Sequence, residues 1–85
     1  MADVTPAETP NPNAMRFALS VMLPEMVNAT QASEAAGTPF AEALFALDGV
    51  VNVYGTADFV SVSKRPAASW DDLLPAITEI LRTHL

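Results

Sequence analysis

The chain contains no cysteine among its 85 residues, and it has only three glycines and one histidine. Without thiolates it cannot form a disulfide or supply the sulfur ligands of zinc sites and iron–sulfur clusters. The glycines are isolated from one another, which excludes a phosphate-binding loop of the GxGxxG or GxxxxGK type. His84 has no second imidazole or thiol to complete a nucleophilic or metal-binding arrangement. We therefore expect no catalytic site, no metal site and no cofactor held by this chain.

Positive charge is also scarce. The chain has four Lys and Arg residues and ten Asp and Glu residues, which gives a net charge of −6. This balance argues against nucleic acid and against anionic membrane surfaces as partners, since both attract basic residues. No apolar run approaches the roughly 20 residues that span a bilayer. The first residues lack the basic and apolar regions of a targeting signal. We expect a cytoplasmic protein with a protein partner, monomeric or weakly dimeric.

The length predicts one domain, since a 9.0 kDa chain has room for a single core. Hydrophobic residues make up 51% of it, which favours folding over disorder. Pro6, Pro10 and Pro12 fall in residues 1–13, a stretch without apolar periodicity. Proline restricts its own backbone and that of its predecessor to extended geometry. We therefore expect residues 1–13 to form an extended, flexible arm and residues 14–85 to form the domain.

Residues 14–19 alternate between apolar and polar side chains, which is typical of a half-buried strand. A second, short strand is predicted at 25–28, and a helical turn at 31–36. Gly37 suits the left-handed residue that closes such a turn. A helix should then begin after Thr38, a favourable N-cap that precedes a proline.

The second half of the chain predicts a hairpin followed by a helix. Two valine-rich strands, 50–54 and 59–64, are joined by residues 55–58, which include Gly55. The alternation places Val51, Val53, Val60 and Val62 on the inner face. Ser69 should cap the last helix. Pro75 should either kink this helix or mark the position where the regular helix restarts.

Together these elements predict an α+β domain of two layers. A mostly antiparallel sheet of three to four strands should carry both helices on one face, because each helix has one apolar stripe. The other face of the sheet should remain open. Its predicted side chains are poor in charge and include two aromatic rings, which is typical of surfaces that bind proteins. The residues predicted to dock a partner are Arg16, Asn52, Tyr54, Phe59 and Ser61. The alternative is that Tyr54 and Phe59 only pair with each other and stabilise the hairpin.

Several stretches, in order along the chain, resemble the N-terminal domain of Nfu/NifU-type iron–sulfur scaffold proteins. They are residues 8–17 (ETPNPNAMRF), 38–45, 47–50, 53–64 and 70–77. The resemblance implies an α+β domain and an association with iron–sulfur cluster biogenesis, without catalytic residues. It also implies that the cluster-binding CxxC pair lies in a separate C-terminal domain. Because this chain has no cysteine, any cluster would be held by a partner.

Three functional hypotheses follow. The first is a non-catalytic accessory or adaptor domain that docks an iron–sulfur scaffold or client protein. The second is a general protein-interaction or regulatory module unrelated to iron metabolism. The third, which the sequence favours least, is weak binding of iron by carboxylates, since the acidic residues are scattered along the chain.

Overall fold

The computed structural model describes residues 3–85 as five strands and three helical segments. The strands are β1 (Val4–Glu8), β2 (Ala14–Leu19), β3 (Val27–Ala29), β4 (Val50–Thr56) and β5 (Phe59–Lys64). The helical segments are a 3₁₀ turn, η1 (Ala32–Ala35), and two α-helices, α1 (Pro39–Phe45) and α2 (Trp70–His84).

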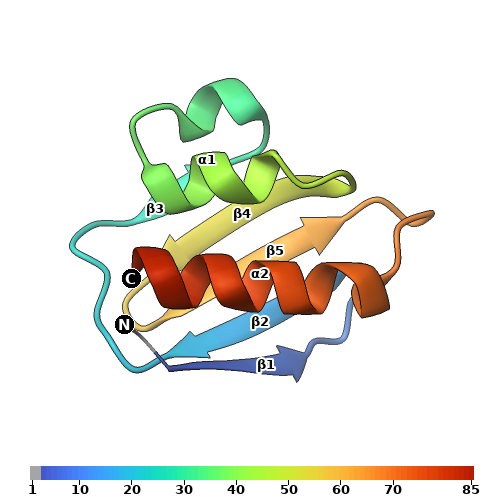
Figure 1. Ribbon diagram of the computed structural model, residues 1–85, viewed down its shortest axis with the longest axis horizontal. Coiled ribbons are helices and arrows are strands. Elements are labelled where there is room, and N and C mark those ends of the chain that lie inside the picture. Colours follow the sequence, from blue (N-terminus) through green and yellow to red (C-terminus); the bar gives the residue numbers. More distant parts are fainter. Residues whose placement is uncertain (1–2) are drawn as a thin grey trace.

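All five strands form one antiparallel sheet in the order β1-β2-β5-β4-β3. Both α-helices lie over the same face of this sheet, α1 in front of β4 and α2 across β5 and β2 (Figure 1). The α+β class, the two layers and the helices on one face are therefore confirmed. The sheet has five strands rather than three to four, because the proline-containing N-terminal stretch adds β1.

Residues 4–8 are extended, as expected, but they are part of the sheet rather than of a separate arm. They pair with β2 from Val4 opposite Leu19 to Glu8 opposite Met15. Pro6 is tolerated because β1 is an edge strand, where a missing N–H group breaks no inner hydrogen bond. The following turn is fastened to the helix layer, since the Trp70 indole Nε1 donates to the carbonyl oxygen of Pro12 at 2.9 Å. Residues 1 and 2 of the expected arm lie outside the described residues.

The core lies between the sheet and the two helices. Its fully buried large side chains come from the inner face of β2, β4 and β5 and from the facing stripes of α1 and α2. They are Phe17, Val53, Val60, Val62, Leu44, Ile77 and Leu81. The inner face also holds Lys64, which is 8% exposed; its Nζ donates to Asn13 Oδ1 at 3.1 Å. The buried ammonium group thus has a polar partner, as burial requires.

Val51 is not in the core, contrary to the sequence prediction. A β-bulge lies between Val50 and Asn52, so Val50 takes the inner position and Val51 is left 40% exposed. A bulge inserts one residue into a strand and shifts the alternation by one position. Strict alternation along β4 therefore predicts the correct face only from Asn52 onward.

Gly55 also has a different role from the one expected of a turn glycine. It lies within β4, and the β4–β5 turn is left to Ala57 and Asp58, with Ala57 at a positive φ of 51°. A Cβ atom at Gly55 would lie 2.9 Å from Leu23 Cδ1. Leu23 belongs to the segment that leads from β2 to β3, and its amide donates to the Ala57 carbonyl at 2.7 Å. Because Gly55 has no side chain, the segment that carries Leu23 can pass close to the tip of the β4–β5 hairpin.

The starts of both α-helices agree with the sequence, and their capping agrees in part. Gly37 and Gly49 adopt positive φ after η1 and α1, as expected of residues that close a helical turn. Ser69 Oγ accepts a hydrogen bond from the Asp71 amide, which confirms the predicted N-cap of α2. Thr38, by contrast, makes no side-chain cap hydrogen bond at α1. Pro75 lies inside α2, which continues from Trp70 to His84.

Candidate protein-docking face

The sheet face that is not covered by helices, here called the open face, brings together the residues selected from the sequence. Arg16 on β2 is paired with Ser61 on β5, and Ser61 is paired with Tyr54 on β4. Asn52, two positions before Tyr54, points to the same side and pairs with Ser63. Because side chains alternate along a strand, antiparallel register alone places these residues on one surface. The row continues to Asn28 on β3, a residue that the sequence analysis did not select.

Three of these side chains form a cluster centred on Phe59. The Arg16 guanidinium carbon lies 4.0 Å from the centroid of the Phe59 ring, which is cation–π geometry. The Tyr54 ring lies on the other neighbouring strand, with its centroid 6.1 Å from that of Phe59 and its plane tilted by 47°. The two rings are half-buried, and Arg16 is exposed. The cluster therefore offers an apolar surface with one cation, built from three strands.

The pairing of Tyr54 with Phe59 that the alternative hypothesis requires is present. It does not displace the docking hypothesis, because the same rings remain half-exposed to solvent. Ala18 and Ser63 also lie on strands of this face. Ser20 follows the end of β2, where its hydroxyl accepts from the Asp3 amide at 2.8 Å, so it belongs to the strand connection rather than to the open face.

Two ion pairs between described residues lie away from the open face. Arg65 contacts Asp48 at 2.6 Å, and Arg82 contacts Glu79 at 3.1 Å. The imidazole Nδ1 of His84 lies 2.8 Å from the Ile80 carbonyl oxygen, to which it donates. Within residues 3–85, no three side chains of the metal-binding types come together as a site for an ion. No described helix is long and apolar enough to cross a membrane.

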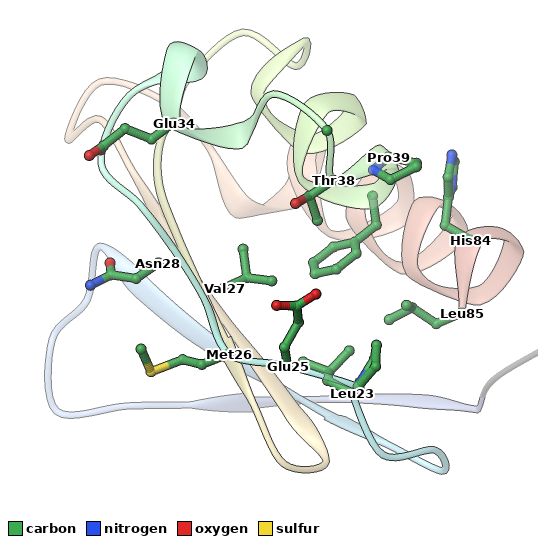
Figure 2. Close-up of a pocket in the computed structure, with 13 residues that line it drawn as sticks. Leu23, Glu25, Met26, Val27, Asn28, Glu34, Thr38, Pro39, His84 and Leu85 are labelled. Atoms are coloured by element: carbon green, nitrogen blue, oxygen red, sulfur yellow. The ribbon is translucent and has the colours of Figure 1, made fainter.

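A cavity of about 500 Å³, which no pattern in the sequence predicts, lies at the β3 edge of the sheet. One wall is the segment 23–28, and the opposite walls are the start of α1 and the end of α2 (Figure 2). The only hint in the sequence is a pair of methionines around Pro24, since Met22 and Met26 are large apolar residues that the structure leaves exposed. The sequence gives no indication that the ends of both helices meet this segment, because that contact depends on the tertiary structure.

The fold, with its open face and helix-covered face, is that of a known class of domains. Residues 4–85 match the family model described as scaffold protein Nfu/NifU N terminal. The chain therefore belongs to this family, and the resemblance seen in the sequence is confirmed.

Individual relatives support this assignment. A NifU-like protein of Schizosaccharomyces pombe, C1709.19c, is 33% identical over 82 residues, which cover 92% of this chain and 32% of the relative. NifU-like protein 5, mitochondrial, of Arabidopsis thaliana is 37% identical over 75 residues, covering 86% of this chain and 27% of the relative. Conserved virulence factor C of Staphylococcus aureus is 33% identical over 70 residues, 81% of this chain and 19% of the relative. The chain thus spans a third or less of these relatives.

Solved structures show the same architecture. The crystal structure of SAV1430 from Staphylococcus aureus matches with a TM-score of 0.79 at 26% identity, over 93% of this chain and 98% of that one. The solution structure of a NifU-like protein from Saccharomyces cerevisiae matches with a TM-score of 0.81 over 98% of this chain and 77% of that one. At 20% identity, the second likeness concerns the fold alone.

Proposed function

We propose that this chain is a non-catalytic adaptor domain in iron–sulfur cluster assembly or delivery, and that it acts by docking a protein partner on its open face. Membership of the Nfu/NifU N-terminal family supports the link to cluster biogenesis. The relatives named NifU-like are about three or more times longer than the matched region, so a cluster-binding function in them can lie outside it.

The observation that carries the docking part is the cluster of Arg16, Tyr54 and Phe59. Aromatic residues and arginine are the types most enriched where proteins bind each other. Here they lie together on the sheet face opposite the one that both α-helices cover in Figure 1. Because the chain has no cysteine, the iron–sulfur cluster is cargo that the thiolates of the partner protein hold. The adaptor domain contributes by binding this partner protein and orienting it.

The experiment is a titration of ¹⁵N-labelled protein with a NifU-type scaffold protein loaded with its iron–sulfur cluster. We expect chemical-shift changes at the amides of Arg16, Tyr54 and Phe59. Arg16→Glu should weaken binding roughly tenfold or more, because it replaces the cation beside the two aromatic rings with an anion. Arg82→Glu is the matched control, since Arg82 is also an exposed arginine but lies on α2.

Two results would contradict the proposal. One is the absence of any shift on the open face with cluster-loaded or cluster-free scaffold. The other is equal weakening by Arg16→Glu and Arg82→Glu, which would indicate a non-specific effect of net charge. The proposed location is the cytoplasm, although three of the relatives carry the word mitochondrial in their names.

A general protein-interaction role outside iron metabolism is the second candidate. It is favoured by the relatives named conserved virulence factor C, whose name mentions no cluster. Capture of partners from the native cell lysate, followed by their identification, separates the two candidates. Partners that are iron–sulfur scaffolds or clients support the first, and a reproducible set without them supports the second.

A further inference from the structure

The cavity at the β3 edge combines an apolar floor with walls that carry two carboxylates, of Glu25 and Glu34, and the imidazole of His84. Its apolar lining includes Phe40 at the start of α1, Val27 on β3 and Leu85 beyond α2. The volume of about 500 Å³ is within the range of sites that hold a small ligand or a few side chains. Phe40 is largely buried, whereas Val27 and Leu85 are half-buried and packed against the core. The floor is therefore preformed, because the core holds it in place.

Two carboxylates belong to the lining, Glu25 and Glu34, and no lysine or arginine within residues 3–85 does. Glu34 Oε1 accepts hydrogen bonds from the Thr30 amide at 2.8 Å and from the Thr30 hydroxyl at 2.6 Å. Glu25 is exposed and forms no ion pair with a described residue. In Figure 2 its carboxylate rises from the 23–28 segment toward the Thr38 side of the cavity. An unpaired carboxylate thus faces an apolar recess.

Thr38 adds a neutral polar group to the same recess. Its hydroxyl makes no cap hydrogen bond at α1, although Thr38 is the N-cap residue. A hydroxyl that is free of the helix can donate to a peptide carbonyl group or accept from a peptide N–H group. Beside it, β3 is the edge strand of the sheet, and an extended peptide can lie along such an edge.

From these features we propose that the cavity binds a short, extended segment of a partner protein in which an apolar side chain stands next to a lysine or arginine. The apolar side chain occupies the recess formed by Phe40, Val27 and Leu85. The neighbouring cation pairs with Glu25. A second copy of this chain is a poor occupant, because both copies carry a net charge of −6 and repel each other. This site is distinct from the Arg16–Phe59 cluster, and it does not depend on any role in iron–sulfur chemistry.

The test uses three short capped peptides added to the ¹⁵N-labelled full chain. The first has a leucine between two lysines, with glycine at both ends. The second replaces the lysines with glutamates, and the third replaces the leucine with glycine. We expect the first peptide alone to shift the amides of Glu25, Val27 and Phe40, with saturable binding that weakens as salt is added. Four outcomes would overturn the proposal. The glutamate peptide could bind, or the leucine-free peptide could bind as tightly as the first. The shifts could also lie elsewhere in the chain, or no peptide could cause any shift.

Two pairs of variants locate the site without threatening the fold. Glu25→Gln should weaken the first peptide by about two- to fivefold, the range for one exposed ion pair. Its control is Glu42→Gln, an exposed glutamate on α1 outside the lining. Met26→Ala should also weaken binding, whereas Met22→Ala should not: the two methionines are 62% and 70% exposed, but only Met26 lines the cavity. Equal effects within both pairs would refute the assignment.

Discussion

The guanidinium carbon of Arg16 lies 4.0 Å from the centroid of the Phe59 ring, so a charged side chain of β2 covers an aromatic side chain of β5. The two residues are 43 positions apart in the chain and meet only because β2 and β5 are neighbours in the sheet. This contact orders the one cation of the cluster. It places a positive charge beside two aromatic rings on the open face.

We expect Arg16 and Phe59 to be energetically coupled. A double-mutant cycle with Arg16→Ala and Phe59→Leu should give a coupling free energy of about 0.5–1 kcal/mol, because cation–π pairs at exposed sites have this strength. Urea denaturation of the four proteins measures it. The same cycle with Arg82→Ala in place of Arg16→Ala should give a coupling near zero. Coupling of equal size in both cycles would mean that Arg16 does not act through the ring.

The bulge in β4 predicts opposite outcomes for two nearby valines. Val53→Ala should lower the free energy of unfolding by about 2 kcal/mol, since Val53 is fully buried and the change removes two methyl groups from the core. Val51→Ala should cost less than about 0.5 kcal/mol, because Val51 is exposed. Chemical denaturation of both variants checks this. A larger loss for Val51→Ala than for Val53→Ala would place the bulge elsewhere.

Gly49 and Gly37 both have positive φ, of 103° and 87°, but only Gly49 is crowded. A Cβ atom at Gly49 would lie 2.7 Å from Ala68 Cβ, whereas one at Gly37 would meet nothing within 4 Å. Gly37→Ala should therefore lower the free energy of unfolding by about 1 kcal/mol, through backbone strain alone. Gly49→Ala should lower it clearly more, because the new Cβ atom also meets Ala68. Thermal unfolding of the two variants gives the order. Equal midpoints would show that Ala68 moves aside freely.

Glu34 should contribute to stability in a pH-dependent way. Its pKa is held below the ordinary value of 4.5 chiefly by the Thr30 hydroxyl and, secondly, by the Thr30 amide. Because the folded state has the lower pKa, this contribution is present above about pH 4.5 and is lost as the pH falls through the folded-state value. Thr30→Val should raise the pKa of Glu34 toward its ordinary value. Thr30→Ser, which keeps the hydroxyl, should leave it low. NMR titration of the Glu34 carboxyl group distinguishes the two, and an unchanged pKa in Thr30→Val would contradict the assignment.

Much of the local structure could be predicted from the residues because the signals are local. Alternation in residues 14–19 identifies β2, and Ser69 marks the start of α2 by a hydrogen bond made within the same turn. The positions of Tyr54 and Phe59 on one face follow from the twofold period of a strand. The absence of cysteine excluded thiolate chemistry outright.

The remaining features depend on contacts between distant segments, and only the tertiary structure decided them. The sequence predicts that Val4–Glu8 is extended, but this segment is a strand of the sheet only because β2 offers a free edge. Gly55 reads as a turn residue, yet it is needed where Leu23 crosses the hairpin. The acidic cavity joins Glu25, Thr38 and Leu85 from three segments. Local propensity acts over a few residues, whereas strand partners and cavity walls are set by packing across the whole chain.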